Sequence, residues 1–215
     1  MIIAIDGPSA SGKGTLARKI ARHFDLAHLD TGSLYRGVAL LVLDGGAHPA
    51  SSAAALKAAK GFSLETLSDP RLRSEAIGEA ASQVAAIPEV RAELLAFQRR
   101  FAARPPGGKA GAVIDGRDIG TVVCPNAGAK FFVTATPEVR AERRTKELLA
   151  RGEVANYDKV LATIRERDRR DQLRDVSPLK AAPDAYLLDT TKLDIDGAFQ
   201  KALAVLADKG FLNAR

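Results

Sequence analysis

The feature that most constrains this chain is a glycine-rich loop that directly follows a short apolar run near the N-terminus. Residues 2–6 read Ile-Ile-Ala-Ile-Asp, which is typical of a buried parallel strand. Gly7 to Thr15 then match the pattern G-x-x-x-x-G-K of a phosphate-binding loop. Leu16, Ile20 and Phe24 follow at helical spacing. Strand, glycine-rich turn and helix in this order predict an α/β fold built on a parallel sheet.

The chemistry of phosphate binding explains the residue types in this loop. Glycines let backbone N–H groups face an anion, and the helix N-terminus adds partial positive charge. Lys13 is predicted to contact the β- and γ-phosphates, and the Thr15 hydroxyl to hold Mg²⁺. Gly14 separates Lys13 from Thr15, and in this the loop resembles the variant of nucleoside monophosphate kinases and not that of GTPases. The alternative is a glycine-rich turn with a surface lysine. The residues predicted to bind ATP are Gly7, Pro8, Ser9, Ala10, Ser11, Gly12, Lys13, Gly14 and Thr15.

Composition narrows the class of protein further. A chain of 215 residues with 46% hydrophobic residues suits one globular domain. A single cysteine excludes an intramolecular disulfide framework and a cysteine-based zinc site. The net charge of +6 favours an anionic partner. No apolar run approaches the ~18 residues of a transmembrane helix and no secretory pattern opens the chain, so we expect a soluble, cytoplasmic protein that does not bind membranes.

Short apolar runs alternate with helical patterns along the rest of the chain. After the first strand, we predict strands over residues 26–30, 112–115, 130–135 and 185–189. Helices are predicted over residues 33–43, 72–84, 137–151, 158–174 and 196–209, with a further helix starting at residue 88. Residues 47–70 show no clear pattern. Strands separated by helices predict a five-stranded parallel sheet with helices on both faces.

Four apolar runs end in aspartate followed by a small residue, at Asp6, Asp30, Asp115 and Asp189. Ligands of open α/β sheets bind beyond the carboxyl ends of the strands, so these acids are expected on the ligand-binding edge. Asp115 resembles a Walker-B acid, which makes it the second predicted Mg²⁺ ligand beside Thr15. The alternative for each aspartate is that it begins a turn or caps a helix.

Arginines near the same edge indicate a second anionic substrate. Arg36 and Arg117 each follow a predicted strand, so both guanidinium groups can bind a phosphate. Arg167, Asp171 and Arg174 stand at i, i+4 and i+7 of a predicted helix and would share one face. Two cations around one carboxylate suit a nucleotide, because arginines can bind its phosphates and the carboxylate can accept hydrogen bonds from its sugar hydroxyls. The alternative is a solvated, salt-bridged helix.

Six segments together resemble the bacterial cytidylate kinases over nearly the whole chain. They are Ile5–Thr15, Leu29–Arg36, Ala81–Ala85, Asp115–Val123, Glu166–Asp171 and Ser177–Lys180. The strings Gly-Arg-Asp-x-Gly-Thr-Val-Val and Ser-Gln-Val-Ala are far more specific than the phosphate loop. The resemblance implies direct, in-line phosphoryl transfer from ATP to CMP or dCMP, with Mg²⁺. It also implies a monomer.

The resemblance assigns the nucleotide contacts residue by residue. It implies that Ser82, Arg91 and Asp118 recognise cytosine, whose N4 donor and N3 and O2 acceptors they can match and uracil cannot. Without the resemblance, Ser82 could be an ordinary small helix residue and Arg91 a solvated one. The residues implied for CMP are Thr31 (where the family often has serine), Arg36, Ser82, Arg91, Arg117, Asp118, Arg167, Asp171 and Arg174. Those implied to neutralise charge during transfer are Lys13, Arg117, Arg167 and Arg174.

The resemblance also divides the chain. A single P-loop kinase domain is expected over residues 1–215, with a core of about 1–36, 84–144 and 175–215, a small CMP-binding insert of about 37–83 and a short lid region of about 145–174. Alternatives are a P-loop kinase for another small substrate (adenylate, thymidylate, shikimate or dephospho-coenzyme A), a regulatory NTPase, and a P-loop protein that binds nucleic acid. Aromatic residues are only 5% of the chain, so stacking platforms for nucleic acid are scarce.

Overall fold

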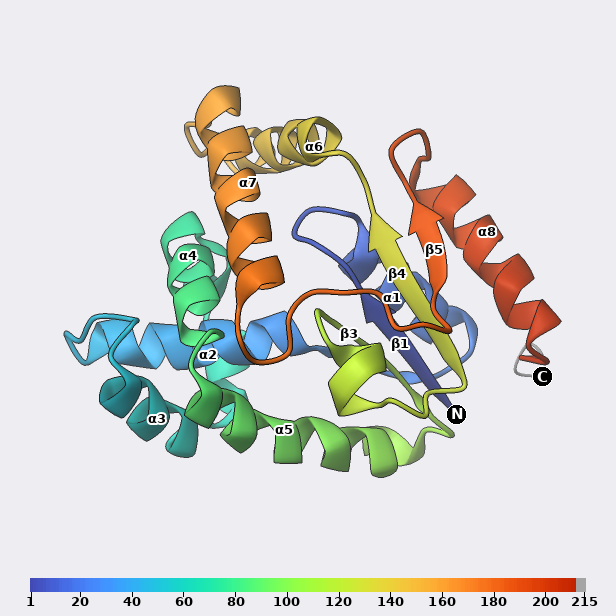
Figure 1. Ribbon diagram of the computed structural model, residues 1–215, viewed down its shortest axis with the longest axis horizontal. Helices are drawn as coiled ribbons and strands as arrows, with labels where there is room; N and C mark the ends of the chain where they lie inside the picture. Colours follow the sequence, from blue (N-terminus) through green and yellow to red (C-terminus); the bar gives the residue numbers. More distant parts are fainter. Residues whose placement is uncertain (212–215) are drawn as a thin grey trace. The chain divides into compact units, whose positions relative to one another are not determined.

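The computed structural model describes residues 1–211, and a central β-sheet organises it (Figure 1). The strands are β1 (Ile2–Asp6), β2 (Ala27–Asp30), β3 (Ala112–Gly116), β4 (Ala129–Thr134) and β5 (Tyr186–Asp189). They form one five-stranded sheet in the order β2-β3-β1-β4-β5. β1 pairs in parallel with β3 and β4, and β4 with β5. The predicted five-stranded parallel α/β fold is confirmed.

The chain divides into two compact units. The larger comprises residues 1–29 and 105 onward, and the smaller Asp30–Arg104. The smaller unit includes the residues 37–83 that were expected to form the insert, and within it α2 packs against α3 and α4, and α3 packs against α5. Its helices are α2 (Thr31–Asp44), α3 (Ser52–Lys60), α4 (Glu75–Val84) and α5 (Pro88–Ala103), with 3₁₀ turns η1 (Leu64–Ser68) and η2 (Pro70–Arg73).

Local capping explains where the helices of the smaller unit begin. The Ser51 and Ser74 hydroxyls accept hydrogen bonds from the backbone at the starts of α3 and α4. Pro88 occupies the first turn of α5, where its missing N–H costs nothing. Leu40, Leu72 and other apolar side chains form a buried cluster in this unit. Residues 47–70 gave no sequence pattern because one short helix and short 3₁₀ turns occupy them.

The larger unit is built around the sheet. Its helices are α1 (Lys13–His23), α6 (Pro137–Ala150), α7 (Tyr157–Leu173) and α8 (Ile195–Asp208), with short turns η3 (Pro106–Gly108) and η4 (Ile119–Val123). Ile5, Ile20, Phe131 and Leu206 belong to one buried cluster that joins the sheet to α1 and α8. A separate small cluster holds α6 against α7. No helix among residues 1–211 is long and apolar enough to cross a lipid bilayer.

Candidate active site

The phosphate loop joins β1 to α1 and needs glycine at two positions. At Gly7 the φ angle is +150°, and a Cβ atom there would overlap the carbonyl oxygen of Val133 on β4. Gly12, which precedes α1, has a left-handed φ of +89°. The Lys13 ammonium donates to the Pro8 carbonyl at 3.1 Å, so the side chain folds back over the loop. The predicted strand, loop and helix are therefore present in the order that phosphate binding requires.

Two hydroxyl groups of this loop are buried without a hydrogen-bond partner. They are the side chains of Ser9 and Ser11, and no partner for either lies within residues 1–211. Buried polar atoms in folded proteins are nearly always hydrogen-bonded. A bound phosphate would supply the missing acceptors. The loop thus has the chemistry of a site whose polar groups are completed by a ligand.

The end of β3 offers a carboxylate close to the start of α1. Asp115 is buried, and its Oδ1 atom lies 2.8 Å from Nε2 of His28. Its Oδ2 atom lies 3.5 Å from the position of a Cβ atom on Gly14, the residue before Thr15. Hard oxygen donors of this kind fit Mg²⁺, which proteins usually hold by one or two side chains together with substrate phosphates and water. Among residues 1–211 no three His, Cys, Asp or Glu side chains gather as a metal cage.

Asp6 has a different role from Asp115, although both end buried strands. Its carboxylate accepts hydrogen bonds from the backbone N–H groups of Ile119 (2.7 Å) and Gly120 (2.8 Å) in η4. Burial raises the pKa of Asp6 to about 6. Asp189 is exposed and accepts from the Thr191 N–H at 2.8 Å. Asp6 and Asp189 therefore support backbone turns, which is the alternative that the sequence left open for them.

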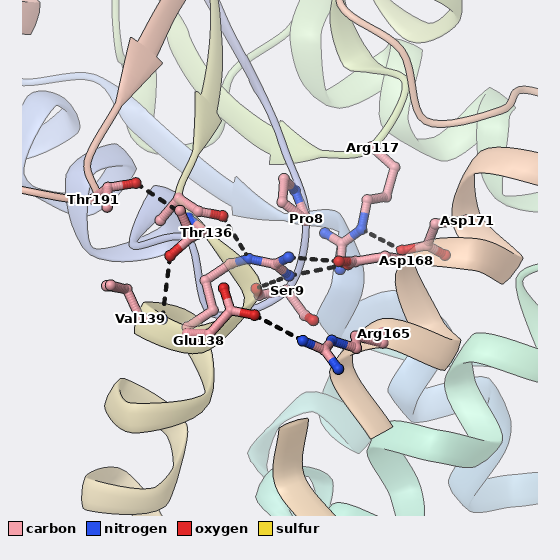
Figure 2. A network of polar contacts seen from close by, with 12 residues as sticks. Pro8, Ser9, Arg117, Thr136, Glu138, Val139, Arg165, Asp168, Asp171 and Thr191 are labelled. Carbon is pink, nitrogen blue, oxygen red and sulfur yellow. Dashed lines mark hydrogen bonds and ion pairs between the residues drawn. The ribbon is translucent and has the colours of Figure 1, made fainter. Parts of the chain in front are cut away.

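Three arginines surround one buried carboxylate in the larger unit. Arg117 Nε donates to Asp171 at 2.8 Å (Figure 2). Burial by itself would raise the pKa of Asp171, but the positive charges of Arg117, Arg174 and Arg167 outweigh it and hold that pKa below its usual range. The structure thus brings these four predicted residues together. Other charges on α7 match the solvated alternative, since Arg169 pairs with Glu166 on the exposed surface.

The predicted face of Arg167, Asp171 and Arg174 lies at the C-terminal end of α7. α7 stops at Leu173, and Arg174 has an extended backbone with ψ of 142°. Its Nε atom donates to the Ser177 carbonyl at 2.6 Å, and the Leu179 N–H donates to the Asp171 carbonyl at 2.7 Å. The chain therefore turns back along the helix end. The φ angle of Arg174 is −66°, which is helical, so its side chain still leaves the chain at the i+3 position relative to Asp171.

The remaining predicted CMP residues of the smaller unit are mostly buried. Thr31 is the first residue of α2, and Ser82 on α4 is buried with no hydrogen-bond partner for its hydroxyl among residues 1–211. Arg36 donates to the Leu72 carbonyl at 2.6 Å. Arg91 on α5 is only 7% exposed, which rules out the solvated alternative for it.

Aromatic and backbone contacts hold Arg91 in place. Its guanidinium lies 5.6 Å from the centre of the Tyr35 ring and donates to the Ala85 carbonyl at 3.1 Å. Asp118, the third predicted cytosine contact, belongs to the larger unit and is also buried.

A cavity of about 660 Å³ in the larger unit was not predicted from the sequence. The phosphate loop, α6 and the segment between β5 and α8 line it. Arg143 on α6 binds the segment between β5 and α8, where it donates to Oγ1 of Thr190 at 3.0 Å and to the Leu193 carbonyl at 3.2 Å. The Thr190 hydroxyl in turn donates to the Ser11 carbonyl at 3.0 Å. No functional role could be assigned to Arg143 or His28 from the sequence, because neither belongs to a recognisable motif.

A parallel sheet that carries a phosphate loop, a buried carboxylate after β3 and an arginine cluster on a later helix together define a P-loop kinase. The family profile described as cytidylate kinase matches residues 3–208. The chain belongs to the cytidylate kinase family, and it is an ATP-dependent nucleoside monophosphate kinase.

Curated relatives agree with this assignment, and solved structures match the fold. The cytidylate kinase of Nitrobacter winogradskyi is 56% identical to this chain over 206 residues, which cover 96% of this chain and 95% of the relative. The cytidylate kinase of Azorhizobium caulinodans is 58% identical over 206 residues, which cover 96% of this chain and 98% of the relative. A crystal structure of an uncharacterized Eubacterium ventriosum protein matches with a TM-score of 0.57 at 14% identity, over 96% of this chain and 98% of that one. A sugar kinase from Janibacter matches at 0.50 and 16% identity, over 96% and 94%. These two structures show the fold alone.

Proposed function

We propose that this chain transfers the γ-phosphoryl group of ATP to CMP and dCMP. The observation that carries the proposal is the cluster of Arg117, Arg167 and Arg174 around buried Asp171, in the same unit as the phosphate loop. Guanidinium groups bind phosphate in a forked geometry, and a carboxylate accepts from sugar hydroxyls. Together with membership of the family, this chemistry favours a nucleoside monophosphate as acceptor.

The donor is proposed to bind along Gly7 to Thr15, with Lys13 on its terminal phosphates. Thr15 and Asp115 would hold Mg²⁺, which when bound neutralises phosphate charge. The adenine base would enter the cavity next to Arg143, since this cavity adjoins the phosphate loop and has the size typical of a ligand pocket. The unpartnered hydroxyls of Ser9 and Ser11 support phosphate binding at the loop.

The acceptor contacts are proposed from the matching residues of the family. Ser82, Arg91 and Asp118 would recognise cytosine, and the unpartnered Ser82 hydroxyl supports this role because the base would satisfy it. Asp171 would accept from the sugar hydroxyls. The residues proposed for the acceptor phosphate are Arg36, Arg117 and Arg174, with Arg167 between sugar and phosphates and Thr31 as a further hydroxyl contact.

The reaction needs positioning more than acid or base chemistry. A phosphate oxygen of CMP attacks the γ-phosphorus in line, the new P–O bond forms, and the bond to the β-phosphate oxygen breaks to release ADP. The attacking oxygen is already anionic, so no strong general base is required. Lys13 and the arginine cluster stabilise the charge that spreads over the transferred group.

The test is ADP release from ATP with CMP, dCMP, UMP and AMP measured side by side. We expect CMP and dCMP to be turned over fastest. A faster reaction with AMP or UMP would favour another monophosphate kinase, and binding of RNA or DNA at physiological salt would favour the nucleic-acid alternative. We further propose a monomer of the cytoplasm, which light scattering after gel filtration and fractionation of cells would test.

A further inference from the structure

One buried arginine that no motif singled out joins three segments of the larger unit. Arg140 lies in the first turns of α6 and is 3% exposed. Its Nε atom donates to the Ala135 carbonyl at 2.9 Å, and one terminal nitrogen donates to the Ser9 carbonyl of the phosphate loop at 3.3 Å. The two terminal nitrogens also donate to both carboxylate oxygens of Asp168 on α7, at 3.0 and 2.5 Å (Figure 2).

These contacts use the planar shape of the guanidinium group. A buried charge is costly unless it is paired and hydrogen-bonded, and Arg140 has both kinds of partner. Its two terminal nitrogens bond the two oxygens of the Asp168 carboxylate, and one of these nitrogens also bonds the Ser9 carbonyl. A lysine carries the same charge but cannot make parallel bonds of this kind.

Two of the three segments, the phosphate loop and α7, are those on which the transfer reaction depends. Ser9 belongs to the loop that we propose to bind the ATP phosphates. Asp168 follows Arg167 directly and precedes Asp171 by one helical turn, so it lies beside the residues proposed for the acceptor. A contact that fixes Ser9 relative to Asp168 therefore fixes donor and acceptor groups relative to each other. Small errors in such alignment lower rates strongly.

We propose that Arg140 is a positioning residue that sets the distance between the phosphate loop and α7. It touches neither nucleotide in this proposal. It acts through the Ser9 carbonyl and Asp168, so that Lys13 and Arg167 meet the same phosphoryl group. The proposal rests on the proposed phosphoryl transfer but does not depend on which monophosphate is the acceptor.

The same two helices carry a second ion pair that serves as a matched control. Arg165 of α7 donates to Glu138 of α6 at 2.8 Å, with the two side chains 60% and 49% exposed. This pair also links α6 to α7, but neither partner is hydrogen-bonded to the phosphate loop within the described residues. A role that consists only of holding α6 against α7 would therefore be shared by both pairs. A role in positioning belongs to Arg140 and Asp168 alone.

The experiment compares Arg140→Lys, Asp168→Asn and Glu138→Gln with the unaltered protein. For each we would measure kcat, the KM values for ATP and CMP, and the folded fraction at the assay temperature by circular dichroism. We expect Arg140→Lys and Asp168→Asn to lower kcat ~10- to 100-fold per folded molecule with KM values within about threefold. Glu138→Gln should stay within about twofold of the unaltered protein, as expected for an exposed pair.

Three outcomes would overturn the proposal. Unchanged kcat per folded molecule, or a rise in KM with kcat retained, would show that Arg140 is structural or acts in ground-state binding. An equal loss in Glu138→Gln would assign the effect to helix packing. If Arg140→Lys does not fold, Asp168→Asn decides, because it keeps the shape of the side chain and the Arg140 bond to Ser9. If the unaltered protein prefers another monophosphate, the proposed function fails and the same comparison is made with that substrate.

Discussion

The contribution of the buried Asp6 carboxyl group to the stability of this protein should fall between acidic and neutral pH. Its pKa rises from 3.8 to about 6 on folding, chiefly because of burial. The folded state therefore holds this proton more tightly than the unfolded chain does. Its contribution to stability is complete below the unfolded pKa and is lost as the pH rises through the folded pKa. Over the full range the loss is about 3 kcal/mol, at 1.36 kcal/mol for each pKa unit.

The variant Asp6→Asn isolates this effect. An amide has no proton to release here, and its lost hydrogen bond to η4 gives an offset of about 1 kcal/mol that does not change with pH. Urea unfolding of both proteins, without nucleotide, gives their free energies of unfolding at pH 4.5 and 7. The linkage relation predicts that the stability of the unaltered protein relative to Asp6→Asn falls by about 2 kcal/mol between these values.

Asp189→Asn is the control for this prediction. Asp189 is exposed, and its hydrogen bond from Thr191 lowers its pKa, so any pH effect there has the opposite sign. Two results would refute the argument for Asp6. The difference in unfolding free energy between the unaltered protein and Asp6→Asn could stay the same at both pH values, or it could favour the unaltered protein more at pH 7 than at pH 4.5. The first result would mean that the two backbone N–H groups of η4 balance burial, and the second that they outweigh it.

Four further predictions concern the nucleotide sites. Lys13→Ala should lower kcat by about three orders of magnitude or more, since the lysine supplies charge to the transferred group; near-normal turnover in a coupled assay would exclude that role. Asp118→Ala should reduce the ratio of kcat/KM for CMP to that for UMP by at least about tenfold, and an unchanged ratio would remove Asp118 from base recognition. Asp115→Asn should raise the Mg²⁺ concentration needed for half-maximal activity by about tenfold, with Asp25→Asn, an exposed acid in the same unit, as control. Arg143→Ala should raise the KM for ATP at least about fivefold and leave the KM for CMP within about twofold, as the cavity beside it lies at the donor loop; an equal rise in both would speak against an adenine site there.

Elements with a strong local signal were predictable from the sequence. The phosphate loop carries its own glycine requirement, and the strands around it are continuous apolar runs. Most predicted bounds agree with the structure within two residues, as for α6 over Pro137–Ala150 against the expected 137–151. The bounds agree because prolines and capping side chains mark several helix starts in the sequence.

Partners that lie far apart in the chain were not predictable. Asp6 and Asp115 have the same sequence surroundings, but one accepts from the backbone of η4 and the other contacts His28. Arg140 and Arg143 stand in a strongly charged helix, where charge normally indicates a solvated face. Only the packing of β4, α6 and α7 shows that Arg140 is buried. Pairings of this kind depend on the tertiary structure and leave no periodicity in the sequence.

Gly7 and Gly12, the two positions of the phosphate loop that need glycine, should differ in how many substitutions they accept. Gly12 is required for its left-handed backbone, and nothing lies within 4 Å of the position of a Cβ atom there. Asparagine adopts that conformation more readily than other residues, and D-alanine prefers it, so both are expected to be accepted at position 12 in saturation or chemical-synthesis libraries. Gly7 has a strand carbonyl in that space. A library should therefore recover folded variants at position 12 and only glycine at position 7.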